Sequence, residues 1–118
     1  MSDVMSKHDL HRLVRHLGGC ARGVMYVRNH PSAFAREIYE RADANDMMWL
    51  ARRQGLQTRR ASAAARRAAS KEPYGAGGHS EPPEDCPACE PKRAASRAAV
   101  LALIPWSLMW AAILGARR

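Results

Sequence analysis

The 118-residue sequence is short of aromatic and acidic residues. It has one phenylalanine, three tryptophans and three tyrosines, whereas 22 residues are alanine. Eleven acids stand against 19 basic residues, 16 of them arginine, and the net charge is +8. Three cysteines cannot all pair within one chain, which excludes a disulfide-stapled secreted miniprotein. The length suits one small domain with appendages.

Sequence motifs of catalytic sites are missing as well. The sequence contains no glycine-rich phosphate loop, HExxH pair or nucleophile elbow. Histidines cluster near the start, at His8, His11 and His16, but no set of carboxylates accompanies them. Cys20 and His30 could imitate a thiol–imidazole pair, yet Cys20 falls on an apolar stripe and is expected in the core. We predict that the protein is not an enzyme.

The longest apolar stretch is the uncharged 19-residue segment 98–116, AAVLALIPWSLMWAAILGA. A helix of this length spans about 28 Å, close to the hydrocarbon core of a bilayer. Pro105 predicts a kink, because it leaves the carbonyl of Leu101 without a donor. We predict a single C-terminal transmembrane helix over 98–116. The alternative is a buried C-terminal helix of a soluble protein.

The charges that flank this segment predict its orientation. Lys92, Arg93 and Arg97 precede it closely, and only Arg117 and Arg118 follow. The positive-inside rule therefore places the N-terminal domain in the cytoplasm. Arginines interrupt every apolar run in the first thirty residues, which argues against a signal peptide. This layout is that of a single-pass, tail-anchored membrane protein.

Most other bulky apolar residues lie in residues 1–57, at the spacing of amphipathic helices. Ser6 is expected to cap the first apolar stripe, in which either one helix runs through Gly18 and Gly19 or two helices meet there. Ser32 is expected to cap the next helix and Asp46 the last, which should end at Gly55. No stretch alternates with the period of a β-strand. Residues 1–57 are therefore predicted to form a small all-α helical bundle.

Part of this domain, CARGVMYVRNHPSAFAREIYERADANDMMWLARRQG, resembles a short helical module of uncharacterised bacterial and phage proteins. In that module an acidic turn is followed by a Trp-Leu pair. The matching positions are Cys20, Tyr26, Ile38, Glu40, Arg41, Asp46, Met48, Trp49, Leu50 and Arg53. Met47 stands where the module usually has an aromatic residue. The resemblance implies a helical fold and a bacterial or phage origin, and it implies no activity.

The next segment is strongly basic. Residues 52–71 carry seven positive charges and no acid. Residues 58–71 are predicted to form an Ala/Arg helix in which Arg59, Arg60, Arg66 and Arg67 share a face of about 120°. This face is expected to bind phosphates of anionic lipid or, less favoured, of nucleic acid. The alternative is a solvated surface helix without a ligand.

Residues 72–97 are predicted to be a disordered linker, because residues 72–91 hold five acids, five prolines and three glycines. Cys86 and Cys89 form a CxxC pair within this linker, which supplies half of a tetrahedral zinc site. A second chain of a homodimer would supply the other half. A redox pair and cysteines without a role are the alternatives, and no cofactor other than zinc is expected.

These features predict a membrane adaptor whose cytoplasmic helical domain recruits or blocks an unidentified protein partner, in a bacterial or phage setting. The competing prediction is a soluble basic helical module that binds nucleic acid or a protein. In that case the apolar tail would be buried in an oligomer.

Overall fold

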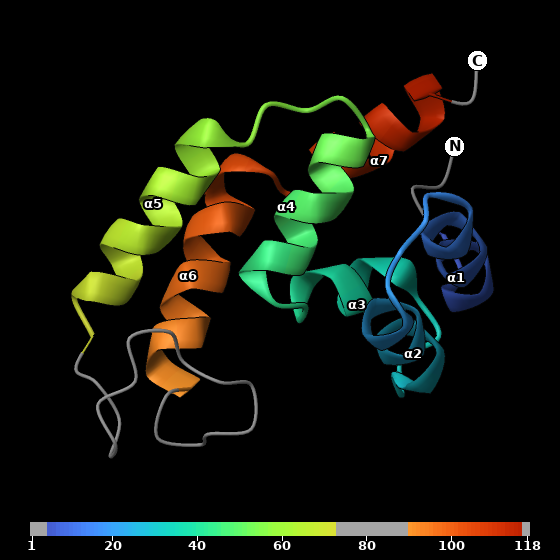
Figure 1. Ribbon diagram of the computed structural model, residues 1–118, viewed down its shortest axis with the longest axis horizontal. Coiled ribbons are helices and arrows are strands. Elements are labelled where there is room, and N and C mark those ends of the chain that lie inside the picture. The colour runs from blue at the N-terminus through green and yellow to red at the C-terminus, as the bar shows by residue number, and fades with distance from the viewer. Residues whose placement is uncertain (1–4, 73–89, 117–118) are drawn as a thin grey trace.

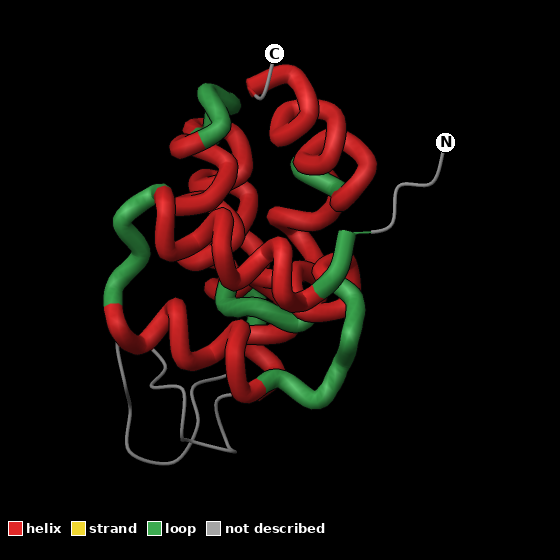
Figure 2. Tube along the Cα trace, turned by 90° about the vertical axis from the view of Figure 1, so that its right-hand side faces the viewer, coloured by secondary structure: helices red, strands yellow, loops and turns green. Residues whose placement is uncertain are grey.

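The computed structural model describes residues 5–72 and 90–116. These residues form helices and no strand, apart from one isolated bridge between Ser6 and Phe34 (Figure 2). The helices are α1 (Lys7–His16), α2 (Ala21–Asn29), α3 (Ala35–Glu40), α4 (Ala44–Arg53), α5 (Arg59–Ser70), α6 (Glu90–Leu103) and α7 (Trp106–Ala116). The predicted all-α fold is confirmed.

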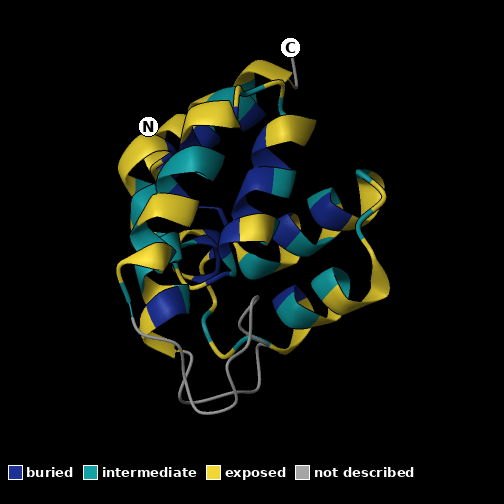
Figure 3. Cartoon of the chain, turned by 60° about the vertical axis from the view of Figure 1, so that its left-hand side comes forward, coloured by how far each residue is buried: buried dark blue, intermediate teal, exposed yellow. Residues whose placement is uncertain are grey.

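The helices share one hydrophobic core. Figure 1 shows α1 and α2 at one end of the molecule and the pair α5 and α6 at the other, with α4 between them. α3 contacts both α1 and α7, and α4 contacts both α5 and α6, so the central helices join the two ends. Buried side chains from all seven described helices line the interior (Figure 3).

Two of the predicted helix boundaries are confirmed. Ser6 is the N-cap of α1, and its hydroxyl accepts a hydrogen bond from the Asp9 amide at 3.1 Å. Gly55 lies just after the C-terminal end of α4 and has φ +81°. This backbone conformation favours glycine and is typical of a helix C-terminus. Both signals are local in sequence, which is why they could be recognised.

The other two predicted N-caps are wrong. α3 begins after Phe34, while the Ser32 hydroxyl accepts from the Phe34 amide and donates to Glu37 at 2.6 Å. α4 begins after Asp43, whose carboxylate accepts from the Asn45 amide at 2.8 Å. Phe34 and Asp43 have the extended backbone that an N-cap requires, with φ −114° and ψ 132° at Phe34 and φ −60° and ψ 144° at Asp43.

The apolar C-terminal segment is two helices. α6 and α7 meet at a bend of 57° beside Pro105. Among the described helices, none alone is long and apolar enough to cross a bilayer, although this bent pair together meets that test of length and composition. Residues 90–97, which we predicted as linker, form the first part of α6. The rest of that linker, residues 73–89, lies outside the described residues.

The bend is held by Tyr39 of α3. Pro105 has no N–H and interrupts the helical hydrogen bonds. After it, the Leu108 amide donates to the carbonyl of Pro105 and not to the carbonyl of Ile104. The Ile104 carbonyl is thereby left for the Tyr39 hydroxyl, which donates to it at 2.6 Å in a buried setting. The ring of Tyr39 also lies 5.5 Å from that of Trp106. Burial raises the pKa of Tyr39 well above its ordinary value.

Small side chains allow α5 and α6 to pack closely. Ala61 and Ala65 of α5 are 2% and 6% exposed. Two polar side chains of α6 donate to backbone carbonyls of α5: Ser96 to Ala65 at 3.2 Å and Lys92 to Ala69 at 2.7 Å. Lys92 is only 4% exposed, and its ammonium group lies beside the last turn of α5, at the negative end of the helix dipole.

The turn between α2 and α3 contains a histidine that favours its neutral form. The Ser32 amide donates to His30 Nδ1 at 3.0 Å, and the Lys7 ammonium donates to the His30 carbonyl at 2.9 Å. Partial burial lowers the pKa of His30, and the charges of Arg41 and Lys7 lower it further against the opposing effect of Glu37.

We expect Tyr39→Phe to lower the free energy of unfolding by about 1–3 kcal/mol, because it leaves the buried Ile104 carbonyl without its donor. Urea unfolding measures this loss.

The stability of the wild type should also fall as pH rises above about 10, since Tyr39 ionises more easily in the unfolded chain. Tyr39→Phe should lack that part of the fall, and unchanged stability in the variant would contradict the anchoring role.

The pKa of His30 predicts a second pH dependence, at the acid end. Because this pKa is lower in the folded chain, the unfolded chain binds a proton first as pH falls below about 6.5. The wild-type Tm should therefore decrease between about pH 7 and pH 5 by more than that of His30→Gln. Parallel curves for the two proteins would show that His30 makes no such contribution.

Candidate functional site

The arginines predicted to bind anions all lie on the exposed side of α5. Arg59, Arg60, Arg66 and Arg67 are exposed. The buried residues of α5, Ala61 and Ala65, lie about 180° away around the helix and face α6. The structure therefore brings the four guanidinium groups together on one face, at the outer edge of the molecule (Figure 1).

Within residues 5–72 and 90–116, this face, which we call the arginine face, has no acidic partner. α5 contains no acidic residue. Among the described residues, none of its four arginines takes part in an ion pair, and the only side-chain hydrogen bond they make joins Arg66 to Ser62 at 3.4 Å. Uncompensated cations held at a fixed spacing attract anions with several negative charges.

The positive charge continues from α5 onto the end of α4. The Arg52 guanidinium donates to the Thr58 hydroxyl at 3.5 Å, across the loop that joins the two helices. The Arg53 guanidinium lies 5.5 Å from the centre of the Trp49 ring, in a cation–π arrangement. Thr58 is buried, and its side chain makes no capping hydrogen bond to α5. The sequence analysis did not include Arg52 and Arg53 among the residues predicted to bind anions.

The predicted zinc ligands Cys86 and Cys89 lie outside the described residues. Within the part of the chain that the structure describes, no three histidine, cysteine or acidic side chains come close enough to hold a metal ion. Cys20 is a free thiol. It is exposed, so the expectation that it belongs to the core is wrong; it occupies the N-cap of α2 without making a capping bond.

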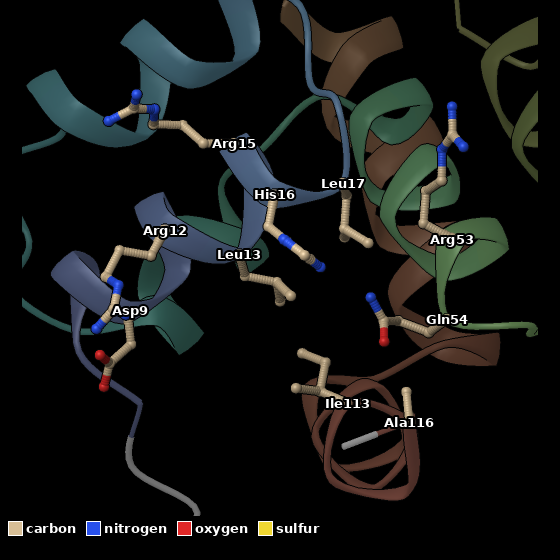
Figure 4. A pocket seen from close by; sticks show the side chains of 10 residues that line it. All are labelled: Asp9, Arg12, Leu13, Arg15, His16, Leu17, Arg53, Gln54, Ile113 and Ala116. Atoms are coloured by element: carbon tan, nitrogen blue, oxygen red, sulfur yellow. The ribbon is translucent and has the colours of Figure 1, made fainter. Parts of the chain in front are cut away.

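A cleft of about 1010 Å³ opens between α1, the end of α4 and α7. Figure 4 shows the imidazole of His16 and the amide of Gln54 directed toward each other across it. Ile113 of α7 forms part of its floor. No sequence pattern indicated this cleft, because its walls come from three helices that are far apart in the chain.

A second cavity, of about 440 Å³, lies between the first two helices and the next two. Its lining is mostly apolar and includes several positions of the bacterial and phage module: Cys20, Tyr26, Ile38, Asp46, Trp49 and Leu50. Gly19 is essential to its wall, since an added Cβ would lie 2.6 Å from Cγ1 of Val14. These six residues therefore share one neighbourhood, in which Ile38 and Leu50 belong to the core and Tyr26 and Trp49 pack against it.

Comparison with known protein families, curated proteins and solved structures finds no significant match to this chain. The resemblance to the bacterial and phage module remains a prediction.

Proposed function

We propose that this protein is a small helical module that binds the phosphate backbone of nucleic acid through the arginine face. The observation that carries the proposal is the exposure of four arginines opposite the buried alanines of α5, none of them in an ion pair with another described residue. Its second support is the packing of the apolar C-terminal segment against Tyr39, which gives that segment a role within the bundle.

The geometry favours contacts to phosphate over contacts to bases. Arg59 and Arg66, like Arg60 and Arg67, are separated by seven residues, or about 10.5 Å along the helix axis. α5 carries no aromatic side chain on which a base could stack and no asparagine or glutamine that could read a base edge. Binding should therefore be strong at low salt and nearly independent of sequence.

Charge counting gives the proposal a quantitative form. Four phosphate contacts release counterions so that log K falls with log salt at a slope of about −3.6 for duplex DNA. Each arginine removed should lower the magnitude of that slope by about 0.9. A membrane surface would also bind arginines, but a duplex without lipid tests the phosphate backbone alone.

We expect the double variant Arg66→Gln/Arg67→Gln to bind a short DNA duplex more weakly and with a slope smaller in magnitude by about 1.8. Fluorescence anisotropy between about 50 and 200 mM salt measures both quantities. The matched control is Arg28→Gln/Arg36→Gln, which removes the same charge from exposed positions on α2 and α3. Equal losses in both variants would indicate attraction by net charge and would overturn the arginine face.

A tail-anchored membrane adaptor is the second candidate. The observation in its favour is that α6 and α7 together have the length and hydropathy of a span. In this form the segment would leave Tyr39, the N-terminal domain would face the cytoplasm, and the arginine face would lie against anionic lipid. An unidentified protein partner would then bind the domain.

Leu108→Asp separates the two candidates. Leu108 is 42% exposed in the bundle, so an aspartate there should leave the Tm nearly unchanged. At the centre of a span, the same aspartate costs about 2.5–3.5 kcal/mol. We expect alkaline carbonate to release the wild-type chain from membranes.

The control is Met109→Asp, which introduces the same charge at a position with 0% exposure and should unfold the bundle. If the wild type resists carbonate and only Leu108→Asp is released, the membrane anchor becomes the leading function.

Three other predictions also remain proposals. We expect a binding role and no catalysis, a homodimer, and zinc shared between the Cys86 and Cys89 pairs of two chains.

A further inference from the structure

The cleft between α1, α4 and α7 joins an apolar floor to a cationic rim. Leu13 and Leu17 supply the accessible apolar floor, and Ile113, which is 1% exposed, lies at its base. The volume of the cleft, about 1010 Å³, is at the upper end of the range for small-molecule sites. A ligand of this cleft must therefore have an apolar part that covers Leu13 and Leu17.

The charged residues around the floor are mostly positive. Among the described residues that line the cleft, Arg12, Arg15 and Arg53 are positive and Asp9 is the only acid, an excess of two positive charges. Figure 4 shows Arg12, Arg15 and Arg53 extending away from the opening at its edges, while His16 points into it. Long cationic side chains at the edge of an apolar cleft complement an anionic group attached to an apolar chain.

Gln54 adds an unsatisfied hydrogen-bond donor to this site. Its Nε2 is buried and has no hydrogen-bond partner. A buried donor left in this state destabilises the free protein, and rotation of the amide toward a bound anion would remove that penalty. The amide lies beside His16, so one anionic head group could be reached by both side chains (Figure 4).

We propose that this cleft binds a single-chain amphiphile with an anionic head group, of the medium-chain carboxylate class. The carboxylate lies at the His16 and Gln54 end, and the alkyl chain covers Leu13 and Leu17 and ends near Ile113 at the base of the cleft. This site uses none of the arginines of α5. The proposal therefore stands or fails independently of nucleic-acid binding.

Calorimetric titration of the full chain with octanoate, below its micellar concentration, tests the ligand class. We expect saturable octanoate binding that is about tenfold tighter than that of 1-octanol, which has the chain without the charge. Butyrate, which has the charge without the chain, should show no saturation. Equal binding of octanoate and 1-octanol would overturn the requirement for an anion.

Gln54→Ala is the sharpest variant. It removes a donor that has no partner in the free protein, so the Tm should stay the same or rise, while octanoate affinity should fall several-fold. Arg12→Glu should weaken octanoate about tenfold. The matched control Arg28→Glu, at an exposed position of α2, should not. Wild-type affinity in both cleft variants would overturn the site.

Methyl chemical shifts locate the bound chain. Octanoate should perturb Leu13, Leu17 and Ile113. Shifts confined to the walls of the 440 Å³ cavity, such as Val27 and Ile38, would assign the ligand to that cavity and refute this proposal. Binding to anionic vesicles without binding to octanoate would likewise refute it, and would favour the membrane candidate.

Discussion

The hydrogen bond from Tyr39 to the carbonyl of Ile104 is the constraint on which the arrangement of the C-terminal half depends. Pro105 breaks the apolar segment, and the carbonyl freed beside the break needs a donor because it is buried. Tyr39 supplies that donor from α3, and Trp106 packs against its ring. With the bend fixed, α7 lies on α3, and α6 is directed toward α4 and α5.

The orientation of the arginine face follows from the same anchor. α5 makes its largest contact with α6, and only on the alanine side of α5 are the side chains short enough for so close an approach. Once Ala61 and Ala65 are buried, the arginines on the opposite side must face solvent. The apolar tail and the basic helix are therefore two parts of one packing arrangement.

Sequence reasoning succeeded where the signal was local. Helical periodicity and the cap at Ser6 were readable, since each depends on residues a few positions apart. It failed at Asp43, which caps α4 three residues before the predicted Asp46. The uncharged run 98–116 is equally compatible with a buried helix and with a span, because composition does not specify what covers it. The cleft at Gln54 could not be predicted, since no single segment contains it.

The register of α5 on α6 depends on a buried polar side chain. Ala61 and Ala65 give the buried side of α5 little relief, so apolar packing alone defines its register on α6 only weakly. Lys92 and Ser96 are four residues apart, as are their acceptors Ala69 and Ala65, so a slide of one turn toward the N-terminus of α5 would still offer both donors a carbonyl. That slide would, however, move the buried Lys92 ammonium away from the last turn of α5, where the helix dipole is negative. The buried lysine therefore favours one alignment of the two helices, much as a single buried asparagine fixes the register of a coiled coil.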